Sequence, residues 1–364
     1  MRILAAEPYA APSHQAFLEG LAAHSKHELV LATLPARTWK WRMRTASFHY
    51  AKLIESEGPW DLIFASDYLN LAETIALLPP KLRALPAVVY FHENQLTYPL
   101  QGTEERDVHH ALTHIHACLT ASKSLFNSDY HRTVFTAAVR ELLAKAPDLD
   151  LSHATRWIEE HSSVLPLGID LERGEPSAPT DAPVILWPHR WEYDKNPAAF
   201  LAALVELERQ GVPFRLRLAG QRFRTRPPEF DELEARFADR IEPGGFLERA
   251  DYLQSLEETH LVVSTAHHEF FGLGTLEAIR AGAFPVLPRS LAYPELISPS
   301  QRDSGLFLYD ASELPTEPLV RAIESIRSGS HLEEREELIR FTDRFRWEEL
   351  APEFDAVFAE AAAN

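Results

Sequence analysis

The chain has 364 residues, of which 45% are hydrophobic and 25% charged, the composition of a soluble globular protein. This length exceeds one ordinary hydrophobic core and predicts two domains. The formal net charge of -18 argues against non-specific binding to nucleic acid, although it allows a local basic patch. The single cysteine, Cys118, excludes a disulfide framework, and we interpret it as a small core residue.

Apolar segments alternate with amphipathic ones along both halves of the chain. In the first half we expect helices that include Ser13–Ala23 and Leu69–Leu78, and strands at Arg2–Ala6, Glu28–Thr33, Asp61–Ala65, Ala87–Phe91, Cys118–Ala121 and Ser163–Leu167. In the second half we expect strands at Val184–Trp187, Arg215–Ala219, Ile241–Gly245, Leu261–Thr265, Phe284–Leu287 and Leu306–Tyr309. This alternation predicts an α/β protein with parallel sheets covered by helices on both faces.

The predicted elements group into two Rossmann-like domains. We expect the first domain to span residues 1–170 and the second to span residues 184–340. Residues 171–183 are rich in proline and charge and are predicted to be a linker. Residues 341–364 contain a strong helical pattern, Trp347 to Ala363, which we expect to cross back and pack on the first domain. Two such domains facing each other across a cleft would suit the joining of two substrates, because closure excludes water.

The beginning of the chain reads as a short first strand, not as a signal peptide. No apolar run is long enough to span a membrane. A cytoplasmic protein is therefore expected.

The most informative segment is the run from His268 to Ala278, which follows a predicted buried strand. Its two glutamates, Glu269 and Glu277, lie on either side of a glycine-containing turn that precedes a helix. The backbone N–H groups at such a helix start bind anions. A sugar nucleotide fits this layout, because its sugar hydroxyls, diphosphate and ribose hydroxyls follow the same order. Alone, the pattern fits equally well a turn with a solvated glutamate at each end.

A second segment strengthens the sugar-nucleotide interpretation. Arg190 and Lys195 are five positions apart on a loop that follows the strand Val184–Trp187. Ligands of open α/β sheets bind at the carboxyl ends of the strands. An arginine fork and a lysine point charge there suit a diphosphate leaving group. The combination with the two glutamates is more specific than either pair alone.

A basic patch interrupts the acidic chain between Ala36 and Arg44. It interleaves cations with aromatic residues, a pattern that favours phosphate contact together with stacking on bases. The alternative is an amphipathic segment whose tryptophans belong to the core. The residues are Arg37, Trp39, Lys40, Trp41, Arg42 and Arg44.

Other signals carry less weight. His110 and His114 share a helical face, but no third ligand for zinc is evident. Asp148 and Asp150 lie in a polar connection, where we interpret them as solvated. No Gly-x-Gly-x-x-Gly motif follows the first strand, which argues against a nicotinamide enzyme.

Several long runs of the chain resemble one enzyme family. They are Glu7-Pro8-Tyr9 with Ser13-His14, Thr33 to Arg44, Tyr90 to Pro99, Glu105-Arg106-Asp107, Trp187 to Pro197 and Ser264 to Gly272. On these runs the chain resembles the tRNA-queuosine mannosyltransferases, within the retaining GT-B glycosyltransferases that carry a Glu-x7-Glu signature. One departure is Ala11-Pro12, which occupies the place of two glycines and stiffens this loop.

The resemblance implies transfer of mannose from GDP-mannose to the cyclopentenediol of queuosine in tRNA, with no metal and no cofactor. It implies same-face attack, in which the leaving phosphate takes the acceptor proton. The catalytic residues implied are His92, Arg190, Lys195 and Glu269. The donor-binding residues implied are Arg190, Lys195, Phe246, Leu247, Glu269, Phe271, Gly272, Leu273, Gly274, Thr275 and Glu277. In this assignment Glu269 holds the mannose hydroxyls, Glu277 holds the ribose hydroxyls, and Phe246-Leu247 lines the base pocket.

The acceptor-binding residues expected are those of the basic patch together with Ser13, His14, Glu93, Asn94 and Gln95. Two alternatives remain open at this stage. The enzyme could transfer sugar to a small molecule or lipid, although the chain has no basic amphipathic helix for membrane docking. It could also be a catalytically silent GT-B protein that binds tRNA or a nucleotide. The sequence leaves the oligomeric state open, and without the resemblance it does not distinguish guanine from uracil in the donor.

Overall fold

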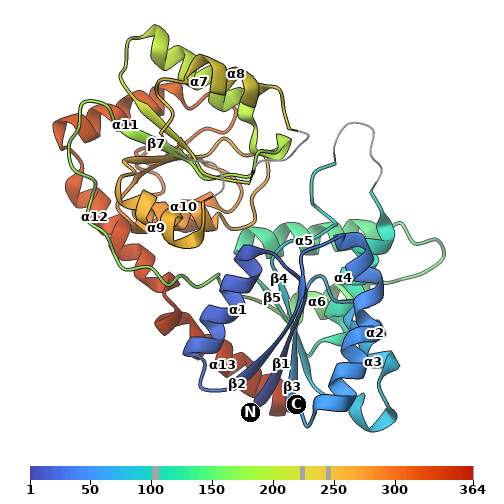
Figure 1. Cartoon of the computed structure of the whole chain (residues 1–364). Helices are drawn as coiled ribbons and strands as arrows, with labels where there is room; N and C mark the ends of the chain where they lie inside the picture. Colours follow the sequence, from blue (N-terminus) through green and yellow to red (C-terminus); the bar gives the residue numbers. More distant parts are fainter. Residues whose placement is uncertain (101–105, 222–225, 243–246, 364) are drawn as a thin grey trace. The chain divides into compact units, whose positions relative to one another are not determined.

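The computed structural model describes the chain except for residues 101–105, 222–225, 243–246 and 364. It divides the chain into two compact units. Unit 1 consists of residues Met1–Asp170 and Phe345–Asn364, and unit 2 consists of Leu171–Arg344. Each unit is an α/β body built on a parallel sheet (Figure 1).

The described residues of unit 1 form one sheet in the order β2-β1-β3-β4-β5-β6. The strands are β1 (Arg2–Ala10), β2 (Glu28–Pro35), β3 (Leu62–Ser66), β4 (Ala87–Phe91), β5 (Lys123–Phe126) and β6 (Ser162–Val164). The helices are α1 (Pro12–His24), α2 (Trp39–Glu57), α3 (Leu71–Leu77), α4 (Val108–Thr120), α5 (Asp129–Leu143), α6 (Ser152–Glu160) and α13 (Trp347–Ala363). A short 3-10 helix spans Pro80–Leu82.

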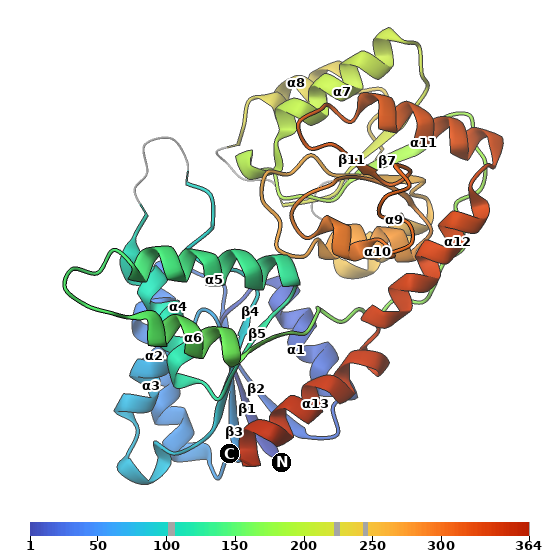
Figure 2. The same cartoon turned by 180° about the vertical axis from the view of Figure 1, so that it is seen from behind.

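The central strands of unit 1 are covered by helices on both faces, and their sequences are correspondingly apolar. All residues of β3 and β4 are buried, which explains their continuous apolar runs. Helices α1 and α13 pack side by side on one face of this sheet, as Figure 2 shows, and α2 and α4 pack on the other. Strand β1 lies between β2 and β3. From β1 the chain continues to β2 on one side and then to β3 on the other, so the sheet has its reversal point between β1 and β3. Ligands of such sheets bind at the carboxyl ends of the strands at this point.

The C-terminal helix α13 packs on unit 1, as expected from its apolar pattern. Its first residue, Trp347, is 1% exposed, and its ring lies against two glycines. A Cβ atom on Gly20 would lie 2.0 Å from Trp347 Nε1, and one on Gly168 would lie 2.3 Å from Trp347 Cδ2. Only glycine permits this approach, so both positions fix where the helix docks.

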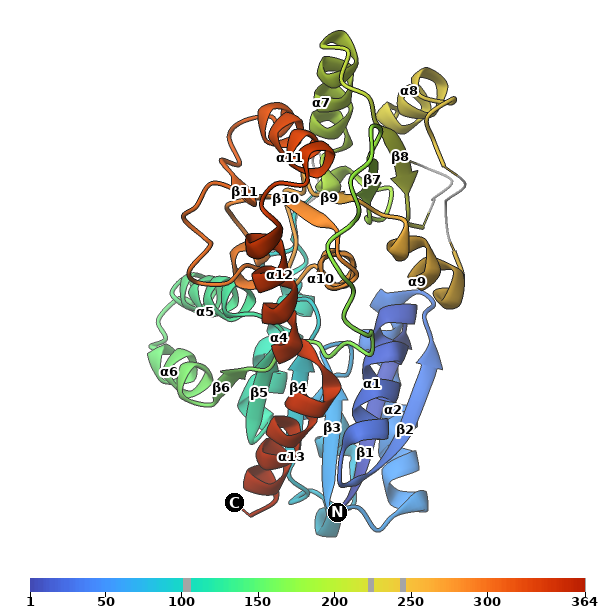
Figure 3. The same ribbon diagram turned by 90° about the vertical axis from the view of Figure 1, so that its left-hand side faces the viewer.

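Unit 2 contains a second parallel sheet, which the described residues form in the order β11-β10-β9-β7-β8 (Figure 3). The strands are β7 (Val184–Trp187), β8 (Arg215–Leu218), β9 (Leu261–Val263), β10 (Phe284–Pro288) and β11 (Leu308–Tyr309). The helices are α7 (Pro197–Arg209), α8 (Glu229–Arg236), α9 (Arg249–Glu257), α10 (Leu273–Arg280), α11 (Thr316–Ser328) and α12 (Leu332–Phe341). Short 3-10 helices span Tyr193–Lys195, Tyr293–Leu296 and Thr342–Phe345.

The reversal point of the unit 2 sheet lies at β7 and β9. Strand β7 pairs with β8 on one side and with β9 on the other. The loops that follow β7 and β9 therefore emerge at the same edge of the sheet. These loops contain three of the residues expected to bind the donor, Arg190, Lys195 and Glu269.

The segment expected to be a linker, residues 171–183, runs along unit 2. The backbone N–H of Gly174 donates to the Arg280 carbonyl at 2.8 Å, and that of Ser177 donates to Gly282 at 3.2 Å. The Arg335 side chain also donates to Ser177 Oγ at 2.6 Å.

One predicted strand is wrong. Residues Cys118–Ala121 mostly belong to helix α4, where Cys118 is buried on the same face as His110, His114 and Ile115. The short apolar run around Cys118 resembles a strand because the last turn of α4 is apolar on its buried face. The strand of this region is instead β5, which begins at Lys123. The predicted strand Ile241–Gly245 partly lies outside the described residues, and Ile241 forms an isolated bridge with Leu216.

Candidate active site

Lys195 is the centre of the polar cluster in unit 2. It is 6% exposed, and its ammonium group donates to the His268 carbonyl at 2.7 Å. The same group lies 3.2 Å from Asp194 Oδ2 and 3.4 Å from Glu269 Oε2. The structure therefore brings together two residues that the sequence analysis assigned to donor binding and catalysis, Lys195 and Glu269.

The two loops that carry these residues are tied to each other. Thr265 follows β9, and its hydroxyl donates to the carbonyls of Lys195 at 2.9 Å and Asn196 at 3.1 Å. The backbone N–H of His267 donates to the Asp194 carbonyl at 2.8 Å. Because Asn196 adopts a left-handed conformation (φ 52°) and caps α7, the lysine turn has little freedom. The position of the Lys195 ammonium group is thus set by backbone as well as by charge.

The electrostatics of this cluster keep Glu269 ionised. Burial alone would raise its pKa, but Lys195 together with His189 and His268 outweighs burial and lowers the pKa of Glu269 to about 2. Burial and the Lys195 charge lower the pKa of His189 to about 3 and that of His268 to about 4. At neutral pH the cluster therefore combines a carboxylate, an ammonium group and two neutral imidazoles, a set that can hold sugar hydroxyls and phosphate.

The glycine turn leads directly into helix α10. Gly272 has a φ of 91° and is the residue before the first helical position, so a side chain there would be strained. A Cβ atom on Gly274 would lie 3.1 Å from Pro188 Cβ and 3.3 Å from the Tyr252 hydroxyl. The helix start therefore packs closely on the loop after β7. The hydroxyl of Thr275 is buried without a hydrogen-bond partner among the described residues.

Glu277 lies inside this packing. Its side chain is 3% exposed, and Oε1 lies 2.6 Å from an Arg249 guanidinium nitrogen. Arg249 begins helix α9 and was not singled out by the sequence analysis. The sequence feature that could have indicated Arg249 is its position just after Phe246-Leu247, the segment expected to line the pocket for the nucleotide base. Phe246 lies outside the described residues, and Leu247 is half-buried in front of α9.

Arg190 differs from Lys195 in its exposure. Its side chain is 47% exposed, and Nε lies 3.3 Å from Glu192 Oε2. A neighbouring network fixes the backbone around it. His189 Nε2 lies 3.0 Å from Ser264 Oγ, which in turn lies 2.5 Å from the Tyr293 hydroxyl. Arg190 is therefore a half-exposed cation on a fixed loop. Phe271, also assigned to the donor, is 5% exposed.

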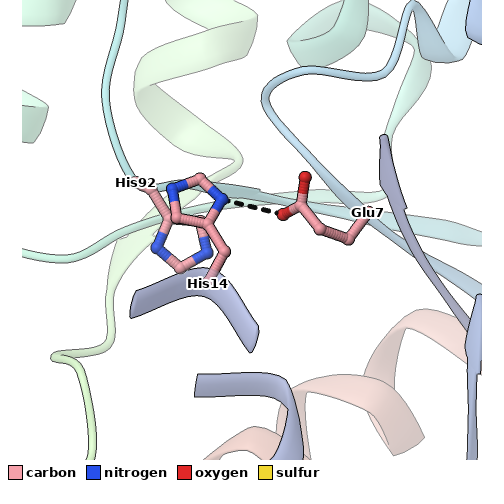
Figure 4. A group of neighbouring side chains, drawn as sticks. All are labelled: Glu7, His14 and His92. Atoms are coloured by element: carbon pink, nitrogen blue, oxygen red, sulfur yellow. Dashed lines mark hydrogen bonds and ion pairs between the residues drawn. The ribbon is translucent and has the colours of Figure 1, made fainter. Parts of the chain in front are cut away.

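A second polar cluster lies in unit 1, at the reversal point of its sheet. Glu7 near the end of β1 accepts a hydrogen bond from His14 Nδ1 at 2.9 Å (Figure 4). The His14 ring stacks on the His92 ring with 4.0 Å between centroids and 24° between planes. Glu7 also accepts a hydrogen bond from the Tyr9 backbone N–H at 2.7 Å. Ser13, next to His14 in the first turn of α1, is exposed.

The pKa values of the two stacked imidazoles in unit 1 are shifted in opposite directions. Burial lowers the pKa of His14, but Glu7, Asp67 and Glu93 outweigh it and raise that pKa above its ordinary value. Burial, followed by the charges of His14 and His131, holds the pKa of His92 well below its ordinary value. His92 is thus a neutral imidazole, and the neighbouring acids favour the protonated form of His14.

Glu7, His14 and His92 also have the spacing of a metal site among the described residues, with ligand atoms within 4.8 Å of one another. Their geometry does not suit a metal ion. The lone pair of an imidazole nitrogen lies in the plane of its ring. Because the rings of His14 and His92 are stacked in nearly parallel planes, their lone pairs do not converge on one point between them. The Glu7–His14 hydrogen bond also uses the carboxylate oxygen nearest the imidazoles. We interpret the group as a hydrogen-bonded pair that supports His92.

Two further acids complete this cluster, and the sequence analysis singled out only the second. Asp67, directly after β3, is 1% exposed and accepts a hydrogen bond from the His92 backbone N–H at 3.1 Å. Glu93 accepts hydrogen bonds from the Tyr68 hydroxyl at 2.6 Å and from Gln95 Nε2 at 3.1 Å. The available signal for Asp67 was an acidic residue directly after the largely apolar strand β3.

Asn94 belongs to the loop itself. It is fully buried, and its Oδ1 accepts backbone hydrogen bonds from Leu96 and Thr97, each at 2.9 Å. This side chain shapes the turn after β4. Its neighbour Gln95 is half-buried and bonded to Glu93.

The basic patch lies before and along the first turns of α2, and its two tryptophans differ. Trp41 is 69% exposed, whereas Trp39 is half-buried between the rings of His110 at 5.1 Å and Tyr68 at 6.4 Å. The patch cations are exposed except for Arg42, which donates to the Pro35 carbonyl at 3.3 Å. Between Glu28 and Glu55 the chain contains no acidic residue.

Comparison with known proteins decides the family. Residues 2–169 match the model described as tRNA-queuosine alpha-mannosyltransferase N-terminal, and residues 169–344 match that of Glycosyl transferases group 1. The chain is 35% identical to the tRNA-queuosine alpha-mannosyltransferase of Drosophila melanogaster, with 100% of this chain and 97% of that protein covered. The chain belongs to the tRNA-queuosine alpha-mannosyltransferase family.

Solved structures agree on the fold of this family member. Sucrose-phosphate synthase from Thermosynechococcus elongatus superposes with a TM-score of 0.73 at 14% identity, covering 100% of this chain and 99% of that one. The Anabaena protein HepE in complex with UDP and glucose gives a TM-score of 0.70 at 16% identity, covering 99% and 100%. The GT-B fold expected from the sequence is confirmed. None of the helices in the described ranges is long and apolar enough to cross a membrane.

Proposed function

We propose that this protein transfers mannose from GDP-mannose to the cyclopentenediol of queuosine in tRNA, with retention at the anomeric carbon. Family membership and the name of the Drosophila relative, a tRNA-queuosine alpha-mannosyltransferase, support the reaction type and the tRNA acceptor. The observation that carries the donor half is the Lys195–Glu269 pair beside the start of α10. It is an ammonium group and a carboxylate fixed where the backbone binds phosphate.

In this proposal the donor lies on unit 2. Lys195 and Arg190 hold the diphosphate, and the backbone N–H groups from Gly272 to Thr275 add to this charge stabilisation. Glu269, ionised at neutral pH, accepts hydrogen bonds from the mannose hydroxyls. Glu277 and its partner Arg249 lie beside α10, where the ribose and base belong.

The transfer itself needs no metal and no protein nucleophile. The bond between mannose C1 and the GDP oxygen breaks, and a cyclopentenediol oxygen bonds to C1 on the same face. The acceptor proton goes to the leaving phosphate oxygen. The protein stabilises the charge that develops on the phosphate. His92 is neutral and can accept or donate a hydrogen bond to the reacting hydroxyls.

The acceptor tRNA is held by unit 1. The exposed cations of the basic patch contact its phosphates, and Trp41 offers a face for stacking with an unpaired base. This assignment explains how a chain with a net charge of -18 binds a polyanion, because the patch concentrates positive charge on one surface.

The decisive experiment incubates the protein with GDP-mannose and tRNA that carries queuosine, followed by mass spectrometry of the nucleosides. We expect a mass increase of one hexose on queuosine. The control is the same tRNA with guanosine at that position, which should remain unmodified. Hexose transfer to free queuosine but not to tRNA would replace the tRNA acceptor with a small molecule. No transfer with any nucleotide sugar would favour a silent binding protein.

A further inference from the structure

The cluster in unit 1 carries more negative than positive charge. Its acids are Glu7, Asp67 and Glu93, and the basic group that pairs with them among the described residues is His14, which already donates to Glu7. His92 is neutral, as are the neighbouring Tyr68 and Tyr90, whose phenol pKa values burial raises well above the ordinary value. The other imidazole nearby, His131, is bonded to Asn127 Oδ1 at 2.8 Å.

Two carboxylate oxygens of this cluster have no hydrogen-bond donor among the described residues. Asp67 accepts its one hydrogen bond through Oδ1, from the His92 backbone, and Oδ2 is unused although the residue is 1% exposed. Glu93 accepts both of its hydrogen bonds through Oε1, which leaves Oε2 unused. These two oxygens are therefore available to accept hydrogen bonds from a ligand.

The surroundings of Asp67 suggest which ligand that is. Burial raises the pKa of Asp67 well above its ordinary value, and although His14 opposes this shift, Glu93 and Glu7 add to it. A nearby positive charge would oppose this shift, because it favours the ionised form of a carboxyl group. A phosphate would be repelled here, so this cluster cannot bind the backbone of the tRNA.

Queuosine contains one group that fits. The cyclopentenediol is joined to the 7-deazaguanine base through a secondary amine, which is protonated at neutral pH and lies next to the hydroxyls that accept mannose. Resting on the proposed function, we propose that Asp67 and Glu93 bind this ammonium group and thereby select a tRNA whose modified base carries a cationic substituent. The same contact places the adjacent diol near His92.

Two tRNA competitors that differ in the substituent on one base, which is cationic in one and neutral in the other, test the inference. One carries 7-aminomethyl-7-deazaguanine at the queuosine position, and the other carries 7-cyano-7-deazaguanine. Both lack the diol, so neither accepts mannose, and only the first is cationic. Each is titrated as an inhibitor of mannose transfer to queuosine-bearing tRNA. We expect the aminomethyl tRNA to inhibit about tenfold or more strongly, the scale of a charge-assisted hydrogen bond.

Variants of Asp67 and Glu93 test whether these two residues produce the preference for the cationic competitor. In Asp67→Asn and Glu93→Gln the preference for the aminomethyl tRNA should fall towards onefold. Asparagine retains an oxygen for the His92 backbone N–H, and Glu93 is half-buried, so both replacements suit the fold. Glu55→Gln is the matched control, because this exposed residue of α2 makes the same charge change away from the cluster. It should retain the wild-type preference.

The possible outcomes separate this inference from the proposed function. Equal inhibition by the two competitors, with normal transfer to queuosine-bearing tRNA, overturns the ammonium site and leaves the proposed function standing. Retention of the preference in both folded variants also overturns the assignment to Asp67 and Glu93. Absence of transfer by the wild type to queuosine-bearing tRNA overturns the proposed function, and this inference with it.

Discussion

Lys195 Nζ lies 3.4 Å from Glu269 Oε2, although 74 positions separate the two residues. The sheet order explains the contact. Lys195 follows β7 and Glu269 follows β9, and these strands are neighbours in the sheet. The hydroxyl of Thr265 then ties the two loops together. A proposed donor site is thus built from two loops at one sheet edge rather than from one continuous motif.

The two cations of the proposed donor site should respond differently to mutation. Arg190→Ala should lower turnover by roughly 100-fold or more, since it removes charge that stabilises the leaving diphosphate. Its side chain is 47% exposed, so the melting temperature should change little. Lys195→Ala should lower turnover and also destabilise unit 2, because it leaves Asp194 and Glu269 without their buried cation. Steady-state kinetics and thermal unfolding of both variants measure this difference.

Lys195→Met tests whether the loss comes from charge or from packing. Methionine retains much of the apolar stem, so it should restore part of the stability and none of the turnover. Full activity in any of these folded variants would remove that residue from the site.

Glu269 should make the stability of unit 2 depend on pH in the acidic range. Its pKa is lowered to about 2 in the folded protein, compared with an ordinary value of 4.5. A depressed carboxyl pKa contributes stability above the unfolded value, and this contribution is lost as the pH falls towards the folded value. The free energy of unfolding should therefore differ more between wild type and Glu269→Gln at pH 7 than at pH 3. Urea unfolding at both pH values measures the difference, and an unchanged gap would contradict the ion pair.

Much of the fold follows from sequence periodicity alone. The buried strand Val184–Trp187 and the C-terminal helix Trp347–Ala363 were predicted with the observed bounds. The end of α4 was mistaken for a strand, because its small apolar residues around Cys118 match either structure over so few positions. Pairing with neighbours decides such cases, and local sequence does not contain that information.

The candidate site was predictable only where residues share a motif. Arg190, Lys195 and Glu269 follow strands in recognisable runs. By contrast, Arg249 reaches Glu277 from helix α9, and Asp67 meets His92 from the neighbouring strand β3. The local sequence provides only a weak positional signal for each of them, since Arg249 and Asp67 acquire these contacts from distant parts of the chain.

The proposed donor predicts selective stabilisation by guanine nucleotides. A ligand that binds only the folded protein raises its melting temperature by mass action. GDP and GDP-mannose should therefore raise the melting temperature more than UDP and UDP-glucose at equal concentration. The Lys195→Met variant is the control, since it should lose most of the shift with either nucleotide. Equal shifts for guanine and uracil nucleotides would contradict the donor assignment.

The Glu7–His14 pair predicts a pH dependence of opposite sign. The pKa of His14 is raised above 6.5 in the folded protein, where burial is outweighed by Glu7 and the neighbouring acids. A raised histidine pKa contributes stability below the unfolded value, and this contribution is lost as the pH rises through the folded value. Wild type should therefore exceed Glu7→Gln in unfolding free energy by more at pH 6 than at pH 9. Glu55→Gln, an exposed control, should show the same difference from wild type at both pH values.

The basic patch predicts how tRNA binding depends on salt. Arg37 and Arg44 are exposed, so replacing both by alanine should weaken binding without disturbing the fold. The slope of log affinity against log salt concentration should become shallower by about 0.7 to 0.9 for each lost phosphate contact. GDP should bind the double variant as it binds wild type, because the donor residues lie in unit 2.

A variant of Trp41 distinguishes the contribution of base stacking to tRNA binding from that of the patch cations. Its ring is 69% exposed, so Trp41→Ala should weaken tRNA binding by roughly 1–3 kcal/mol, the range measured for base stacking on aromatic side chains. The salt slope should remain that of wild type, because no phosphate contact is lost. Trp157→Ala is the matched control, since this tryptophan of α6 is also exposed in unit 1 and lies outside the patch. If Trp41→Ala binds tRNA with the affinity and salt dependence of wild type, Trp41 does not stack on a base and the patch binds through its cations.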